Sequence, residues 1–185
     1  MTFIDKLRSF QERIRTPNIP ETRTGNNAYD SDWSRISNFI KPEFPMLTNG
    51  ESVLKYLSMD VIDVLQQIRT EASVPFTTSP VAGAYVRHQA SGSRHSTQNK
   101  TRLSDAVDLF FNRQSFYRVY DAIMTNASVG GFGLYFDKTF NGQSRPMFHI
   151  DLRNDRMYWV TNRAGTFIYM HSNPKQYFQT IADNL

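Results

Sequence analysis

An aspartate in the middle of an apolar run constrains the fold of this 185-residue chain more than any other feature of the sequence. Asp108 stands within residues 106–111, "AVDLFF", a short run in which every other side chain is apolar. An unpaired buried carboxylate is costly, so Asp108 needs a partner. The sequence leaves three partners open: the start of a nearby helix, an arginine, or a metal ion.

The N-terminal part of the chain differs in composition from the rest. Apolar residues recur at three- and four-residue spacing over residues 3–14, which predicts a short amphipathic helix. Residues 16–35 are rich in Pro, Asn, Gly, Thr and charged side chains, with little to bury. We therefore predict an amphipathic helix and an extended arm over residues 1–36, and one domain with a C-terminal extension over residues 37–185.

Periodicity in the domain predicts an α+β fold with a small antiparallel sheet and helices packed on one side. Helical spacing favours helices over residues 53–71, 115–126 and 173–185. Alternating or β-branched stretches favour strands at residues 74–87, 131–136, 147–153, 156–161 and 166–171. The last four of these strands are expected to form two hairpins.

Composition limits the chemistry without choosing a function. The chain has no cysteine, so a metal would have to be bound by histidine and carboxylate. A net charge of +4 suits an anionic polymer, either nucleic acid or cell-wall material. No apolar run is long enough to span a bilayer, and the first 17 residues carry charges where a signal peptide needs an apolar stretch. We therefore expect neither a membrane span nor a signal peptide.

One of the four histidines, His149, lies in the alternating segment "MFHIDLR". The pleat places Met147, His149 and Asp151 on one face of the strand, and the apolar side chains between them on the other. A lone histidine at such a position is commonly structural. His95 and Asp108 also need partners, however, and two histidines with one aspartate form the ligand set of a catalytic zinc site whose fourth position is left for water.

The order of these segments resembles that of the zinc D-alanyl-D-alanine carboxypeptidases and related peptidoglycan peptidases. The motifs are "GAYVRH", "SRH", "AVDLF", "GGFGLYF" and "FHIDLR", and the resemblance covers about residues 39–160. It implies a peptidase-like fold, zinc bound by His95, Asp108 and His149, and an arginine, Arg87, that holds the substrate carboxylate.

The sequence departs from the family pattern in two places. Twelve residues separate His95 from Asp108 where the family usually has six, an insertion that a loop tolerates because closure entropy grows slowly with length. The family histidine that handles the proton of the attacking water is replaced by Met147, which has no useful basicity. Asp105 is the catalytic residue we predict in its place, with His88 and Asp137 as alternatives.

Two functions therefore follow from the resemblance. The first is a zinc-dependent peptidase that cleaves an amide bond in peptidoglycan stem peptides, as a phage lysin or a virion-associated enzyme made in the host cytoplasm and acting at the cell wall. The alternative is a catalytically impaired structural or attachment protein of a phage virion, with residues 1–36 docking onto a protein partner. Nucleic-acid binding is not expected, because the basic stretch near residues 85–102 contains no groove-reading motif.

Overall fold

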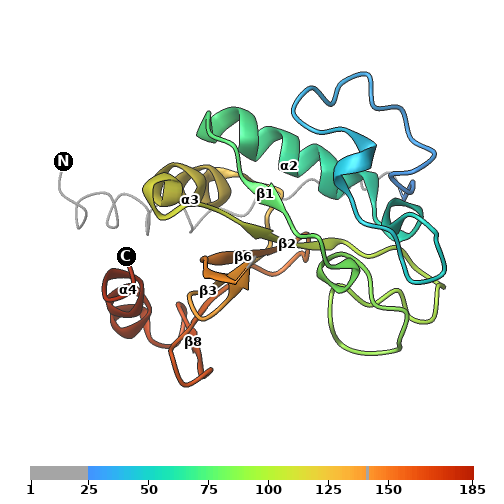
Figure 1. Cartoon of the computed structure of the whole chain (residues 1–185). Helices are drawn as coiled ribbons and strands as arrows, with labels where there is room; N and C mark the ends of the chain where they lie inside the picture. The colour runs from blue at the N-terminus through green and yellow to red at the C-terminus, as the bar shows by residue number, and fades with distance from the viewer. Residues whose placement is uncertain (1–24, 141) are drawn as a thin grey trace.

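The computed structural model describes residues 25–140 and 142–185 and confirms the predicted α+β class (Figure 1). The predicted helix at residues 3–14 and most of the predicted arm lie outside these residues. The helices of the described part are α2 (Met59–Ala72), α3 (Phe116–Thr125) and α4 (Pro174–Ala182). The main sheet consists of β1 (Thr77–Thr78), β2 (Ala106–Phe110), β3 (Gly131–Tyr135), β6 (Met147–Asp151), β7 (Met157–Thr161) and β8 (Phe167–Tyr169), while β4 (Thr139–Phe140) and β5 (Gln143–Ser144) pair separately.

The sheet is mixed, so the prediction of an antiparallel sheet is wrong for one strand pair. The spatial order is β1-β2-β6-β3-β7-β8, and both predicted hairpins, β3 with β6 and β7 with β8, are present. Strand β7 runs parallel to β3 because β2 and β3 already occupy both edges of β6. The chain reverses direction after β6. Because β6 is antiparallel to β3, the next strand, β7, runs parallel to β3 and pairs with its free edge.

A glycine permits the crossing that leads to this parallel pair. The connection from β6 to β7 passes so close to Gly130 that a Cβ there would overlap the carbonyl group of Arg153. The Gly130 amide donates to the Asp151 carbonyl over 3.0 Å, and its own carbonyl accepts from the Met157 amide over 2.8 Å. The preceding helix, α3, ends at Thr125, close to the predicted end at residue 126, so Gly130 lies in the connection to β3.

The helices pack against one face of the sheet. Phe132 and Phe148 project from β3 and β6 into the core, and Tyr120 of α3 meets Phe132 edge to face at a centroid distance of 5.6 Å. Tyr177 of α4 is fully buried and belongs to the same hydrophobic core as Tyr120. Helix α2 packs beside α3 above the sheet (Figure 1). The other face of β2, β3 and β6 is therefore available for a site.

Two predicted elements are shorter in the structure. The expected helix over residues 53–71 divides into a 3-10 turn, Val53–Tyr56, and α2, because the Ser58 hydroxyl accepts from the Asp60 amide and caps a new start. Within the expected strand over residues 74–87, only β1 joins the sheet; a 3-10 turn, Ala82–Ala84, follows it, and Arg87 forms an isolated bridge with Ser96. The proline and glycine of this segment explain the loss of pairing.

The described end of the predicted arm is packed on the domain. Ala28 is fully buried, its amide donates to the Leu57 carbonyl over 2.8 Å, and its carbonyl accepts from the Trp33 indole over 2.7 Å. Trp33 in turn meets Phe44 edge to face. Among the described residues, contact with the domain is thus already present about ten residues before the predicted boundary at residue 37.

Candidate metal centre

Two neighbouring strands place a carboxylate opposite an imidazole. Asp108 on β2 and His149 on β6 are register partners, so their side chains emerge side by side on the face away from the helices. Their flanking residues, Val107 and Ile150 among them, point into the core. The pleat argument made for His149 from the sequence is therefore confirmed.

The third side chain comes from the long loop between β1 and β2. The Arg87 amide donates to the His95 carbonyl over 2.8 Å, and the Thr97 amide donates to the Arg87 carbonyl over 3.0 Å, a short parallel bridge inside the loop. His95 and Thr97 are both buried. This bridge fixes the backbone on both sides of His95 and holds its ring over the sheet.

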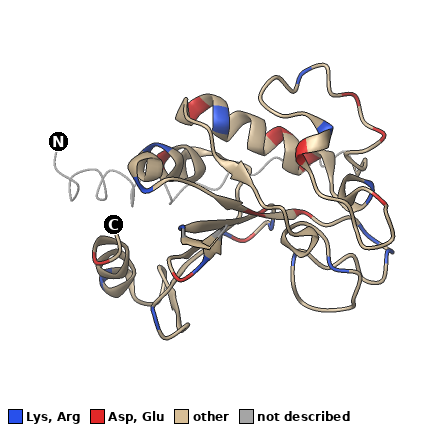
Figure 2. Cartoon of the chain, viewed as in Figure 1, with Lys and Arg blue, Asp and Glu red and all other residues tan. Residues whose placement is uncertain are grey.

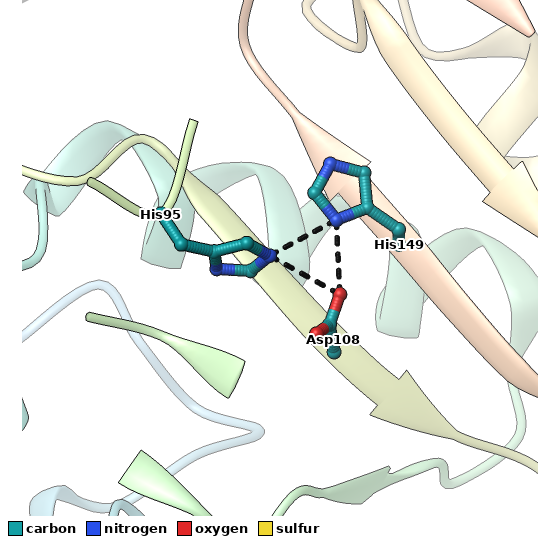
Figure 3. A group of neighbouring side chains, drawn as sticks. All are labelled: His95, Asp108 and His149. Carbon is teal, nitrogen blue, oxygen red and sulfur yellow. Dashed lines mark hydrogen bonds and ion pairs between the residues drawn. The ribbon is translucent and has the colours of Figure 1, made fainter. Parts of the chain in front are cut away.

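The three side chains converge on one point (Figure 3). Nδ1 of His149 lies 2.9 Å from Oδ1 of Asp108 and 3.1 Å from Nε2 of His95. Nε2 of His95 lies 3.3 Å from the same carboxylate oxygen. Each residue is less than a tenth exposed, at 3% for His95 and 8% for Asp108 and His149. The group could hold a metal ion.

The spacing of the three atoms suits a small tetrahedral ion. Nitrogen and oxygen ligands at about 2.0–2.1 Å from a tetrahedral zinc ion lie about 3.3 Å from one another. The three separations in the site, 2.9, 3.1 and 3.3 Å, are within a few tenths of an ångström of that value. Three protein ligands would leave the fourth tetrahedral position open.

A second carboxylate, that of Asp151, orients His149 through the other ring nitrogen, Nε2. Oδ2 of Asp151 lies 3.0 Å from Nε2 of His149, the ring nitrogen that faces away from Asp108. Arg153 donates to Asp151 from Nε over 2.8 Å, and Asp151 is only 1% exposed. A carboxylate on the distal nitrogen fixes the tautomer and raises the basicity of a metal-binding histidine. We did not predict this role for Asp151 from the sequence.

Two glycines on β3 make room beneath the site. Gly131 and Gly133 face the same side as His149, which is the register partner of Gly133. A Cβ at Gly131 would overlap the Asp151 carboxylate, and one at Gly133 would overlap the indole of Trp159. The alternation of glycine in "GGFGLYF" was the sequence signal for these neighbours, since a strand glycine often marks close approach by another group.

Hydrogen bonding dominates the electrostatics of His95, Asp108 and His149. Burial opposes the charged form of His149, but hydrogen bonds with Asp108 and Asp151 outweigh it and raise its pKa to about 9. Burial likewise opposes ionisation of Asp108, yet the two histidines lower its pKa. Burial lowers the pKa of His95, which therefore stays neutral and suited to bind a cation. His149 must lose its Nδ1 proton when a metal binds.

These shifts predict that the metal-free protein loses stability as the pH rises. The pKa of His149 is raised from 6.5 to about 9, so its contribution is complete below about pH 6.5 and disappears as the pH approaches 9. The difference corresponds to at most about 3 kcal/mol. Urea unfolding at several pH values in the presence of a chelator measures it. A flat profile between pH 6.5 and 9, or an equal slope in His149→Phe, would contradict the assignment.

A cleft of about 470 Å³ opens onto the triad formed by His95, Asp108 and His149. Four basic residues line it, Arg87, Arg94, Lys138 and Arg153, although basic and acidic residues are interspersed over the described chain as a whole (Figure 2). Arg153 is engaged with Asp151, as described above, and Lys138 forms an ion pair with Asp137. Arg87 is exposed, and in the described part of the chain no residue accepts a hydrogen bond from its terminal nitrogens.

The three candidates for a proton-handling residue are engaged elsewhere. Asp105, the predicted catalytic residue, forms an ion pair with Arg94 and does not line the cleft. Nδ1 of His88 lies 2.9 Å from the Thr97 hydroxyl. Asp137 belongs to the ion pair with Lys138. Met147 does line the cleft.

Replacing Asp151 by asparagine is expected to weaken zinc binding by about 10- to 100-fold, the usual cost of losing such a supporting carboxylate. Asparagine keeps the shape but not the charge that favours a metal-binding imidazole. Competition titration against a chromophoric chelator measures the affinity, with the exposed Asp155→Asn as the matched control. Equal zinc affinity in the two variants would show that Asp151 does not support the site.

Comparisons with protein-family models, with curated proteins and with solved structures find no match for this chain. What the fold and the site define is therefore an α+β protein with a buried His-Asp-His group at the floor of a cleft. No relative supplies a function, which has to be inferred from the chemistry of these side chains.

Within the described residues, no helix combines the length and the hydropathy that crossing a membrane requires.

Proposed function

We propose that this protein is a zinc-dependent peptidoglycan peptidase that hydrolyses an amide bond in cell-wall stem peptides, as a phage lysin or a virion-associated enzyme. The observation that supports this most strongly is the convergence of His95, Asp108 and His149 within 3.3 Å of one another at the floor of a cleft. The ligand set and its spacing suit zinc, and the order of the surrounding motifs resembles that of the zinc D-alanyl-D-alanine peptidases.

Different residues of the cleft would have different roles in amide hydrolysis. Zinc, when bound, polarises the substrate carbonyl and lowers the pKa of water to about 7. Asp151 holds His149 in the tautomer that leaves Nδ1 for the ion. Arg87 donates from Nε to the Gly83 carbonyl over 3.0 Å, which leaves its terminal nitrogens for a substrate carboxylate in the bidentate geometry that guanidinium favours.

The test uses purified protein with its zinc content measured. Intact peptidoglycan and a synthetic stem pentapeptide are incubated with it, and released D-alanine and peptide fragments are identified by mass spectrometry. We expect cleavage that a chelator abolishes and added zinc restores, and none by His149→Ala. Cleavage that survives complete zinc removal would refute a zinc peptidase.

Met147 supports a second candidate function. It occupies the cleft position where the peptidases carry a proton-handling histidine, and losing such a group typically costs about 10² to 10⁴ in rate. A structural or attachment protein of a virion could retain the zinc site for stability alone. Stoichiometric zinc without cleavage of either substrate would favour this candidate.

A further inference from the structure

Tyr135 is a hydroxyl group in the cleft that the proposed function has not used. It ends β3 on the face that carries Gly131 and Gly133, and its register partner on β6 is Met147. The half-buried Tyr135 lines the same cleft as the triad. The phenol therefore stands beside the side chain that replaces the proton-handling histidine.

A hydrogen bond orients this phenol. The indole nitrogen of Trp159 donates to the Tyr135 oxygen over 3.0 Å. Trp159 also packs against the His149 ring at a centroid distance of 5.3 Å, so the indole links the phenol to a ligand of the site. In the described part of the chain, no group accepts a hydrogen bond from the Tyr135 hydroxyl, whose proton is therefore available to a bound molecule.

The surroundings keep the phenol protonated. Burial raises the pKa of Tyr135, and the negative charge of Asp108 raises it further, against the hydrogen bond from Trp159 and the charge of Arg87. Lys138 lies over the ring at 5.6 Å from its centroid. A neutral phenol at working pH is a donor, which is what a carbonyl oxygen needs as it gains negative charge.

We propose that Tyr135 is a catalytic residue that donates a hydrogen bond to the scissile carbonyl oxygen as the attack of water converts it into an oxyanion. Water forms the new bond to the carbonyl carbon and loses a proton to the solvent, the π electron pair moves to the oxygen, and Tyr135 keeps its proton throughout. When that pair returns, the C–N bond breaks and the amine takes up a proton from the solvent. The basic residues that line the cleft are less suited: Arg94, Arg153 and Lys138 are paired with carboxylates, and Arg87 lies exposed. This proposal rests on the proposed function.

The variant Tyr135→Phe removes one oxygen atom and tests the proposal. Loss of one oxyanion donor typically lowers kcat by about 10² to 10³. We expect that loss on the stem pentapeptide, with KM and zinc affinity changed by less than about twofold. Tyr117→Phe, at an exposed tyrosine of α3, is the matched control and should behave like the wild type. A kcat within twofold of wild type, or a loss of zinc equal to the loss of kcat, would overturn the proposal.

A binding measurement separates this proposal from the proposed function. A phosphinate analogue of the stem dipeptide carries tetrahedral oxygens that mimic the oxyanion, and calorimetry on zinc-loaded protein gives its affinity. We expect Tyr135→Phe to bind it about 10²-fold more weakly, with unchanged affinity for the cleaved peptide. If the wild type binds zinc but cleaves nothing, the proposed function fails, while the affinity for the phosphinate still tests the role of Tyr135. Equal phosphinate affinity in the wild type and Tyr135→Phe, or no binding by either protein, overturns the role of Tyr135 as an oxyanion donor.

Discussion

Replacing Asp108 by alanine is expected to abolish zinc binding at micromolar metal. A structural zinc site is worth about 10–16 kcal/mol over four ligands, so one ligand corresponds to about 3 kcal/mol, or more than about 100-fold in affinity. The effect should exceed that average here, since the same Asp108 oxygen lies within 3.3 Å of both histidine nitrogens. Competition titration measures the change, and Asp121→Ala, an exposed aspartate on α3, is the control.

The same substitution also tests the electrostatics of the metal-free site. Asp108 and Asp151 together raise the pKa of His149 to about 9, so removing Asp108 should bring that pKa down and shrink the pH dependence of stability. Asp108→Asn keeps the volume of the side chain, so it shows whether an effect of Asp108→Ala comes from a packing defect. If both variants bound zinc as tightly as the wild type, the His-Asp-His site would be wrong.

The sequence allowed the strand of His149 and the burial of Asp108 to be predicted, because the periodicity and the apolar character of a segment need no information about its partners. Alternation fixed the face of His149, and the apolar neighbours of Asp108 fixed the burial of its carboxylate. That the two residues would be register partners follows from the order of β2, β3 and β6, which short apolar stretches do not determine. His95 was placed by resemblance, since its position depends on backbone hydrogen bonds inside a loop.

Other features depended on groups far apart in the chain. The parallel pairing of β7 with β3 follows from which edges of β6 are already occupied, a property of the assembled sheet. The support that Asp151 gives to His149 depends on Gly131 leaving space on a neighbouring strand. The separate start of α2 was the local exception, because Ser58 followed by Asp60 is a capping pattern that hydrophobic spacing alone overlooked.

Replacing Gly131 by alanine is expected to destabilise the protein by about 3 kcal/mol or more, the upper end of the usual cost of overpacking. The added methyl group would overlap the carboxylate of Asp151, which cannot move freely because His149 and Arg153 both bond to it. For a chain of this size, 1 kcal/mol shifts the Tm by about 2–4 °C, so the Tm should fall by about 6–12 °C. Gly83→Ala is the control, because a methyl group there meets no atom within 4 Å.

A double variant separates overlap with Asp151 from a general effect on β3. In Asp151→Ala the atoms that the new methyl group would strike are gone, although His149 and Arg153 lose their partner. If overlap is the cause, Gly131→Ala combined with Asp151→Ala should cost clearly less than the sum of the two single changes, since contacting residues do not act additively. An additive result in thermal and urea unfolding would contradict this. It would mean that the glycine serves the backbone of β3 and not the carboxylate that orients His149.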